Sequence, residues 1–478
     1  MGCIDDFDTD NRSINVNIKR GTMMQNSMTL SRGDLKIQMR ILAVPAAFGF
    51  LFSTLFNVVD SFFAGQIGTN AIAGMALAFP VFFLLLSIAS GIGNGVNALA
   101  AIALGKDDMS EYHALFKNTI GITFVFGVII PLIAPLFAQQ LFIAQGALEE
   151  PLFYGMRYVG VVMIGYVFFM ANFAINGMLY AQGNSKPFRN FLLIATIVNI
   201  GLNPLFIFGF WFIPALDTAG IALATVLVQL GGTVYLMAHL IRSDAFDVRQ
   251  FLKAPFSFRI IKGIFAQGIP AALNNATIAI GIFIINFYVM YYGGTDTVAA
   301  YGIAIRIEQL ALVPTIGLNV AVLSIVGQSF GAKKMERIYA TWRLGTVIGL
   351  IIMTIGIVVI VPFAPWLIVL FDRSDAVVEA GTTYLRIEAF AFLSYVFLNI
   401  GISVLQGVKK PMFAIWIGVF RQVVPLGLFY VLGTIFAMGI LGVWWGIVII
   451  NWTAVVITLV YVRMMLKLRK RQLLSQPT

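Results

Sequence analysis

One aspartate lies inside an apolar run, where an ionisable side chain is unusual. Asp60 belongs to the stretch Leu55–Phe63, and no basic residue near it in the sequence could neutralise it. Placing such a group within a membrane span costs about 2.5 to 3.5 kcal/mol, which makes it a functional candidate. A buried carboxylate without a fixed partner favours any state that cancels its charge. Asp60 is therefore predicted to bind a proton or a metal cation; the alternative is an interfacial aspartate in contact with water.

Uncharged polar side chains are expected at a similar depth. Asn57 lies three residues before Asp60 and so on the same helical face. Two pairs at the helical i, i+4 spacing and one threonine complete the set: Asn172 with Asn176, Asn199 with Asn203, and Thr225. Their oxygens could complete a cation shell around one carboxylate or relay protons to it. The same groups could also simply join helices.

The other charged residues inside apolar runs have a structural interpretation. Arg306, Glu308, Glu388 and Arg421 are predicted to form charge pairs that face the interior of a helix bundle. Arg157 lies near the outer end of a run, where a structural role at helix ends is expected.

The elements that must position these residues are membrane-spanning helices. The chain has 478 residues, is 60% hydrophobic and 11% charged, and has a mean hydropathy of +0.92, whereas soluble domains carry about 25% charged residues. The apolar runs reach the roughly 20 residues that a helical span needs and do not alternate as barrel strands do. The predicted fold is an all-α membrane protein with about twelve transmembrane helices, at residues 40–64, 72–103, 115–139, 152–180, 188–212, 219–241, 260–292, 297–328, 341–365, 379–405, 411–434 and 440–466.

The distribution of Lys and Arg predicts the orientation. Nearly all basic residues between spans fall on one side, and Arg373 is the exception on the other. Because cytoplasmic flanks retain positive charge, both termini are predicted to be cytoplasmic, in a multi-pass protein of the inner membrane. The first 35 residues lack the apolar core of a signal peptide. The net charge of +10 is explained by this bias and requires no nucleic-acid partner.

The second half of the chain repeats the first. Matches keep their order and include loops: Pro45 with Pro270, Gly68 with Gly294, Gly91 with Gly317, and Gly105 with Gly331. Six spans per half is an even number, so the halves must be parallel copies, with a substrate cavity expected between them. The predicted organisation is a cytoplasmic tail at 1–38, an N-terminal lobe at 39–242, a linker at 243–258, a C-terminal lobe at 259–467 and a tail at 468–478.

Several kinds of chemistry are excluded by count or by motif. One cysteine and two histidines cannot form a disulfide framework or a Cys/His metal site. No nucleophile motif or phosphate-binding glycine loop is present, so the protein is not expected to be an enzyme and needs no cofactor. In the alignment that pairs Gly68 with Gly294, Asn286 corresponds to Asp60, so only the first half has a charged residue at this position.

Four sequence stretches resemble the multidrug and toxic compound extrusion (MATE) family, and the likeness covers the chain after its tail. They are Asn57–Asp60 with Ala64 and Gly65, Gln182–Pro187, Asn199–Pro204 with Ala224 and Thr225, and Gln328–Lys334. The resemblance implies two six-helix lobes in a V shape that export amphipathic, often cationic compounds in exchange for H⁺ or Na⁺. It also implies that Asp60 is the main cation-binding carboxylate, with Asn199 and Thr225 as co-ligands, and that Asn172 and Asn176 line the adjoining cavity.

The chain departs from the family pattern in both halves. Some members have a second aspartate where this chain has Asn203, which leaves one formal charge and favours H⁺ over Na⁺ as the coupling ion. The acidic pair that some members use in the second lobe is not expected here, since span seven has Asn274 and Asn275 and mid-span ten has no carboxylate. The pattern is most similar to the DNA-damage-inducible-protein-F branch.

A lipid or lipid-linked oligosaccharide flippase of the same superfamily is the alternative. Such a protein usually needs a strongly cationic cavity, to which Arg306 and Arg421 would contribute only two charges. The expected partners are small-molecule drugs or toxic metabolites and membrane lipids, and the expected state is a monomer.

Overall fold

Helices make up nearly all of the chain that the structure describes. The computed structural model describes residues 30–145, 149–211 and 214–474, so most of the predicted N-terminal tail lies outside the described residues. The helices are α2 (Leu35–Ile67), α3 (Thr69–Gly105), α4 (Met109–Ala144), α5 (Glu149–Ile164), α6 (Tyr166–Ala181), α7 (Lys186–Phe208), α8 (Thr218–Ile241), α9 (Val248–Lys253), α10 (Phe258–Gly331), α11 (Met335–Val369), α12 (Asp375–Gly407), α13 (Met412–Tyr430) with a π-helical extension (Val431–Ile435), and α14 (Ile440–Leu474).

The longest helix is two membrane spans. Continuous α10 would have 74 residues, or roughly 110 Å at 1.5 Å per residue, against a hydrocarbon core of about 30 Å. Its backbone breaks at Gly294, where φ is 73°, a conformation that glycine adopts at little cost. Gly68, its counterpart in the repeat, also has a positive φ, at 147°, between α2 and α3. The two arms of α10, residues 258–293 and 295–331, therefore match α2 and α3.

The fourth predicted span is bent rather than straight. α5 and α6 meet at Gly165 with a change of direction of 52°. A Cβ at Gly165 would collide with the side chain of Val226 in α8, so the glycine permits close packing where the helix bends. Ten described helices are long and apolar enough to cross a membrane, and the bent pair makes an eleventh span. With α10 counted as two, the prediction of about twelve spans is confirmed.

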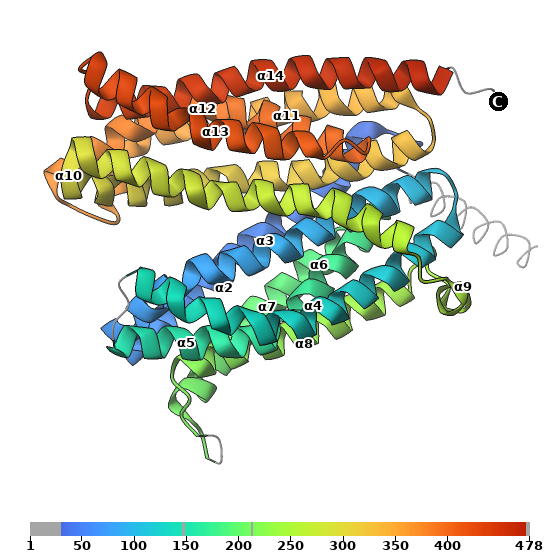
Figure 1. The fold of residues 1–478 in the computed structure, drawn as a ribbon, viewed down its shortest axis with the longest axis horizontal. Coiled ribbons are helices and arrows are strands. Elements are labelled where there is room, and N and C mark those ends of the chain that lie inside the picture. Colours follow the sequence, from blue (N-terminus) through green and yellow to red (C-terminus); the bar gives the residue numbers. More distant parts are fainter. Residues whose placement is uncertain (1–29, 146–148, 212–213, 475–478) are drawn as a thin grey trace, which may run out of the picture.

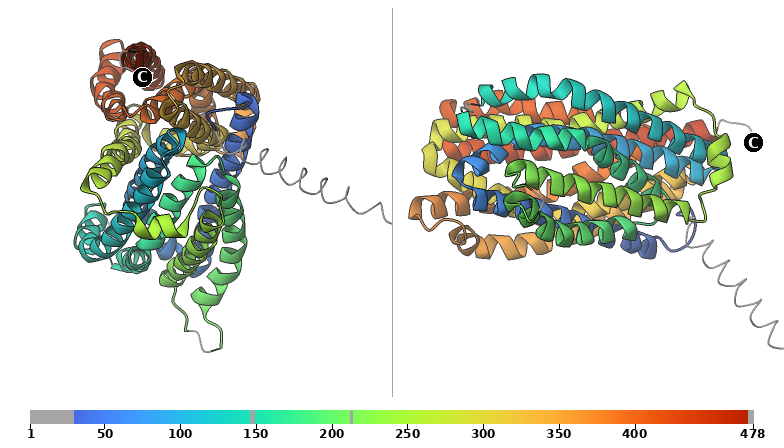
Figure 2. Two further views of the ribbon diagram at one scale, coloured as in Figure 1. Left: turned by 90° about the vertical axis from the view of Figure 1, so that its right-hand side faces the viewer. Right: turned by 90° about the horizontal axis from the view of Figure 1, so that it is seen from below.

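The helices form two lobes. α2 to α8 lie in one lobe and α10 to α14 in the other, as the blue-to-green and yellow-to-red segments of Figure 1 show. The right-hand view of Figure 2 shows that the helices of both lobes run along one common direction, as spans of one membrane must. Each lobe has its own apolar core, with Tyr112 and Phe142 in the first and Phe392 and Trp444 in the second.

Residues matched by the repeat make equivalent contacts where the lobes touch. Gly91 in α3 packs so closely on α10 that a Cβ would lie 2.6 Å from the carbonyl oxygen of Gly268. Its counterpart Gly317 packs on α2, where a Cβ would lie 2.6 Å from the backbone nitrogen of Ala47. Farther along, Ser324 Oγ donates to Asn97 Oδ1 at 3.0 Å across the same junction. The internal repeat thus builds the lobe interface twice, once from each side.

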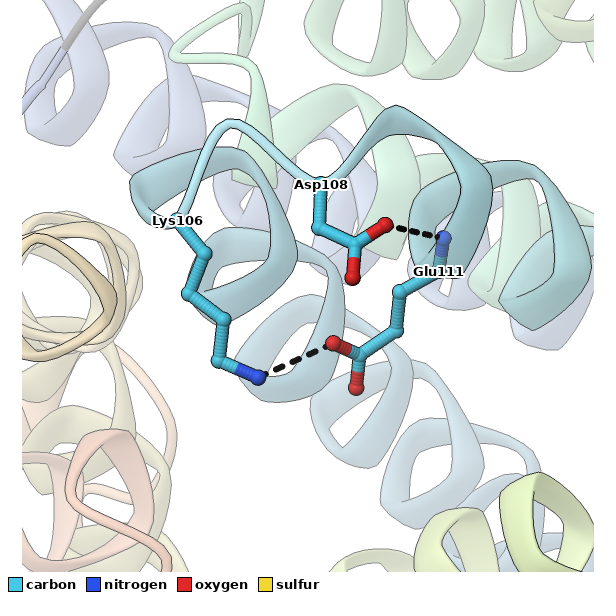
Figure 3. A network of polar contacts seen from close by, with 3 residues as sticks. All are labelled: Lys106, Asp108 and Glu111. Carbon is cyan, nitrogen blue, oxygen red and sulfur yellow. Dashed lines mark hydrogen bonds and ion pairs between the residues drawn. The ribbon is translucent and has the colours of Figure 1, made fainter.

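The ends of the helices that carry most Lys and Arg, here called the basic side, are fastened by polar contacts. Figure 3 shows Asp108 Oδ1 accepting from the backbone N–H of Glu111 at 2.8 Å and Lys106 pairing with Glu111 at 2.9 Å. The first interaction caps α4 at its N-terminus. In the other lobe, burial and then the charge of Lys106 lower the pKa of Lys409, so the two lobes lie close together on this side.

The described residues just before α2, 30–34, pack against the second lobe. Leu30 is 2% exposed and belongs to the core of the second lobe. Arg337 in α11 donates from Nε to the Leu30 carbonyl at 2.9 Å and from Nη1 to the Gly33 carbonyl at 3.0 Å. Ordered structure therefore begins before residue 38, where the predicted tail ended.

Candidate functional site

Asp60 is enclosed by three helices of the first lobe. It lies in α2 and its side chain is 3% exposed, so the alternative of a carboxylate in contact with bulk water does not hold in this conformation. α7 presents one face to α2 because its buried residues recur at helical spacing, among them Thr196, Asn199 and Asn203. Thr196 Oγ1 donates to the Phe52 carbonyl of α2 at 3.2 Å. This contact fixes the register of α7 against α2.

Two neutral donors bind the carboxylate. Asn203 Nδ2 donates to Asp60 Oδ1 at 3.0 Å, and Thr225 Oγ1 of α8 donates to Asp60 Oδ2 at 3.1 Å. Asn203 Nδ2 also contacts Asn199 Oδ1 at 3.0 Å. The four residues predicted as a cation-coupling set, Asp60, Asn199, Asn203 and Thr225, thus lie together in the structure.

The site retains unused polar atoms and lacks a cationic partner. Asn199 Nδ2 and Asn203 Oδ1 are buried and make no hydrogen bond within the described residues. Across residues 30–474, as far as they are described, the ion pairs are Lys106–Glu111 and Arg157–Asp217, so no basic side chain neutralises Asp60. An isolated buried charge is strongly unfavourable. The arrangement can therefore take up one monovalent cation, and the unpaired Asn203 Oδ1 is a further oxygen beside the carboxylate.

The other three predicted residues lie apart from this cluster. Asn57 is exposed, and its Nδ2 donates to the Ser53 carbonyl of its own helix at 2.9 Å. Asn172 is buried, donates to Gln229 Oε1 at 2.7 Å and accepts from Thr233 at 2.9 Å, which joins α6 to α8. Asn176 is also buried, one turn farther along α6. Their assignment to a substrate cavity stays a prediction.

The second lobe holds two buried glutamates that lie close to each other rather than in separate charge pairs. Glu308, in the second arm of α10, and Glu388, in α12, are both buried and close enough for their charges to interact. Tyr384 donates to Glu308 at 3.0 Å and Tyr395 donates to Glu388 at 2.8 Å. This pair differs from the one that some family members have: span seven carries no carboxylate, and the two glutamates lie on spans eight and ten.

The predicted charge pairs are not formed at ion-pair distance, although the charge of Arg421 acts on both glutamates. Within the described residues neither glutamate has a basic group at ion-pair distance. Arg306 lies two positions before Glu308, on another face of the helix, and is exposed. The Arg421 guanidinium instead lies over the ring of Tyr395, 5.5 Å from its centroid. The one signal in the sequence was the i, i+7 spacing of Glu388 and Tyr395, which places a carboxylate and a hydroxyl on one helical face.

A cavity of about 420 Å³ opens beside this acidic pair. Its wall combines apolar and aromatic side chains with Glu308, Arg421 and several amides. Phe83 of α3 contributes from the first lobe, so the cavity faces the junction of the two lobes. A concave, largely apolar site with few polar groups suits an amphipathic small molecule.

Comparison with known proteins agrees with the repeat and with the two-lobe architecture. The family model described as MatE matches residues 45–205 and 270–431, so its two matches begin at the paired prolines Pro45 and Pro270. The chain belongs to the MatE family. MATE proteins are transporters, so this chain is a multi-pass membrane transporter and not an enzyme.

Relatives of this MATE transporter match it along most of its length. Probable multidrug resistance protein YoeA of Bacillus subtilis is 28% identical over 85% of this chain and 89% of its own length. Probable multidrug resistance protein NorM of Thermotoga maritima is 24% identical over 87% and 89%, respectively. A solved structure described as the outward-facing conformation of a multidrug resistance MATE family transporter superposes with a TM-score of 0.85 at 25% identity, covering 93% of this chain and 99% of that chain. These matches confirm the family resemblance and the fold class; the assignment to a branch stays a prediction.

Proposed function

We propose that this MATE transporter is a cation-coupled antiporter that exports amphipathic or cationic drugs and toxic compounds by alternating access. The observation that carries the proposal is the burial of Asp60 against neutral donors without a basic partner. A transporter that couples to an ion needs a site that is charged when empty and neutral when filled. A single carboxylate in an apolar lobe meets this requirement with either H⁺ or Na⁺.

H⁺ is the coupling ion that this geometry favours. Both oxygens of Asp60 already accept hydrogen bonds, from an amide N–H and a hydroxyl. These donors stabilise the ionised carboxylate, whereas a Na⁺ ion would need oxygens turned toward it in their place. Protonation requires only that one donor move away, and the free Asn203 Oδ1 can then accept from the new carboxyl proton after the amide rotates.

The proposed cycle links this exchange to the junction between the lobes. Asp60 takes up a proton from the outside and becomes neutral, which removes the electrostatic cost of enclosing the site. The lobes then rearrange around the Gly91 and Gly317 contacts and open toward the cytoplasm, where the proton leaves and substrate enters. The ionised carboxylate regains the Asn203 and Thr225 hydrogen bonds, and the protein returns with its substrate to the outward-facing state.

The cavity beside Glu308 in the second lobe supports cationic amphipathic molecules as the substrate class. An acidic side chain among aromatic and apolar groups attracts a cationic amphipathic molecule. The relatives named as multidrug resistance proteins agree with this class. A flippase for acidic lipid-linked glycans is less well supported, because the cavity wall holds Arg421 together with a carboxylate rather than a cluster of basic residues.

The proposal places the protein in the inner membrane as a monomer, with both termini in the cytoplasm. In this topology the loop near Asp296 is external, which labelling of tags in intact cells would test. External labelling of a C-terminal tag would contradict the topology.

Dye transport in inverted membrane vesicles tests the function directly. An acidic lumen should drive ethidium into vesicles that contain the transporter, and a protonophore should abolish this uptake. Uptake driven by a Na⁺ gradient alone would replace H⁺ by Na⁺ in the proposal. Absence of gradient-driven uptake, together with a lipid-linked glycan defect in cells that lack the gene, would favour the flippase.

A further inference from the structure

A lateral groove lies where the first helix of one lobe crosses the other lobe. It has a volume of about 370 Å³ and is bounded by α2, the second arm of α10 and α11. Its wall is apolar, with Ala47, Pro314, Leu318 and Ile352 among the lining residues. Lys36 and Arg40 also line it and lie at its end on the basic side of the molecule.

These two basic residues form a charged mouth to the groove. They are four positions apart in α2 and therefore on one helical face. Both side chains are exposed, and in the described part of the chain neither takes part in an ion pair. The nearby Asp34 carboxylate accepts from the backbone N–H groups of Lys36 and Ile37 at the start of α2. Two positive charges thus remain at the level where phospholipid head groups lie.

The repeat shows that this groove is specific to one side of the molecule. The alignment that pairs Pro45 with Pro270 pairs Arg40 with Phe265, and the alignment that pairs Gly105 with Gly331 pairs Ile352 with Phe126. The rings of Phe126 and Phe265 pack together, 5.7 Å apart, at the equivalent crossing of α4 and α10. Aromatic side chains therefore fill on one side the space that is open, with a basic mouth, on the other.

We propose that this groove binds an anionic phospholipid, with an acyl chain along Ala47, Leu318 and Ile352 and the head-group phosphate at Lys36 and Arg40. Inside a bilayer an apolar groove takes up the chain of whichever lipid is adjacent, so the basic pair supplies the selectivity. A neutral or zwitterionic head group would leave both charges without a matching anion. Because α2 belongs to one lobe and α10 and α11 to the other, the bound lipid contacts both lobes at their junction.

Native mass spectrometry of the full chain, titrated with phosphatidylglycerol or phosphatidylcholine, tests the proposal. The wild-type protein should retain phosphatidylglycerol in preference to phosphatidylcholine. Lys36→Gln and Arg40→Gln should each weaken phosphatidylglycerol binding about fivefold, the contribution of one basic residue at an anionic lipid surface. Lys262→Gln, an exposed basic residue at the start of α10 that lines no part of this groove, is the matched control and should bind as wild type.

A variant that fills the groove distinguishes the contribution of the acyl chain to binding from that of the head group. Ile352→Phe copies the opposite side of the repeat and keeps both basic residues, so retention of both lipids should be lost. Excess inorganic phosphate should not displace the lipid. Equal retention of phosphatidylglycerol by wild type and Arg40→Gln, or displacement by phosphate alone, would overturn the proposal. Lys36 and Arg40 are exposed, so their variants keep the test decisive even where Ile352→Phe unfolds at a lower temperature than wild type.

Discussion

The two lobes share their helix packing but place their acidic side chains differently. In the first lobe the carboxylate is Asp60 on the first helix, enclosed by Asn203 and Thr225. The matching position of the second lobe is Asn286, and the carboxylates there are Glu308 and Glu388 on later helices. The glycines and prolines that set the packing occur in both halves, whereas the groups that carry charge do not. Chemistry in a duplicated fold must therefore be assigned lobe by lobe.

The surroundings of the two acidic sites differ as well. Glu308 lines a cavity shared with Arg421 and the ring of Tyr395, whereas Asp60 is closed off by neutral side chains. In the alignment of the two halves Phe82 corresponds to Glu308. The ring centroids of Phe82 and Phe169 lie 5.9 Å apart. An aromatic core residue thus occupies in the first lobe the place of a cavity carboxylate in the second. We infer that the first lobe exchanges the ion and that the second binds substrate.

The largest expected effect is that of Asp60→Asn. The substitution keeps the shape of the side chain and makes the first lobe resemble the second at Asn286, but it removes the charge that a proton would cancel. Proton-driven ethidium uptake into inverted vesicles should be abolished while expression and insertion remain normal. Asp296→Asn, the same change at an exposed carboxylate at the start of the second arm of α10, should transport as wild type.

Full drug resistance in cells that express Asp60→Asn at the wild-type level would show that Asp60 of the first lobe does not bind the coupling ion. The coupling ion would then have to bind elsewhere, and the acidic pair of the second lobe would be the next candidate.

A smaller effect is expected from Glu308→Gln. Loss of the cavity carboxylate should raise the apparent KM for a cationic dye about tenfold, the equivalent of about 1.4 kcal/mol, while the dependence of transport on the proton gradient remains. Dye uptake measured over a range of dye concentrations, with and without the gradient, separates the two quantities. The exposed Glu379→Gln is the matched control. Loss of gradient dependence in Glu308→Gln would show that both lobes bind the ion.

The sequence alone was sufficient for the fold and for part of the site. Long apolar runs separated by charged turns predict the spans, and paired glycines and prolines such as Pro45 and Pro270 predict the two lobes. The spacing of Asn199 and Asn203 places both on one face of α7. That this face meets Asp60 and Thr225 was implied only by the family resemblance, because no spacing within one helix reveals which helix lies opposite.

The features that the sequence does not reveal depend on contacts between distant segments. Glu308 and Glu388 were predicted to form charge pairs with Arg306 and Arg421, but the hydrogen bonds they accept come from tyrosines of α12. The bend at Gly165 depends on the close approach of α8. The hydrogen bonds of Asn172 to Gln229 and Thr233 of α8 likewise cannot be read from one helix of the sequence.

Asn203→Asp adds a second carboxylate to the first lobe, which then has an acidic pair as the second lobe does. Asn203 Nδ2 lies 3.0 Å from Asp60 Oδ1, so the new carboxylate would lie next to the old one. Two such groups resist joint ionisation and titrate as a unit, so the pair should keep a proton to higher pH. The pH optimum of proton-driven efflux should therefore move upward by about one unit, and any response to Na⁺ should become stronger.

The same change at an exposed amide is the control for Asn203→Asp. Gln140→Glu should leave the pH profile unchanged, since Gln140 is an exposed side chain of α4, a helix that contributes no residue to the Asp60 site. An unchanged pH profile and Na⁺ response in well-folded Asn203→Asp would mean that residue 203 does not share a cation site with Asp60.

The smallest effect on transport is expected from Asn172→Ala, although this residue is as well buried as Asp60. Asn172 donates to Gln229 Oε1 and accepts from Thr233 Oγ1, so its side chain connects α6 to α8 and has no contact with the carboxylate. Its removal leaves two partly buried polar groups without their partner, which should lower the free energy of unfolding by about 1 to 3 kcal/mol. Thermal unfolding of the purified protein should show a lower Tm, while the ratio of proton-driven to gradient-free dye uptake stays at the wild-type value. Asn57→Ala, which removes only a contact within α2, should change neither quantity. If Asn172→Ala instead keeps its Tm and loses transport, Asn172 belongs to the substrate path as the family resemblance implies, and the first lobe would then share substrate binding with the second.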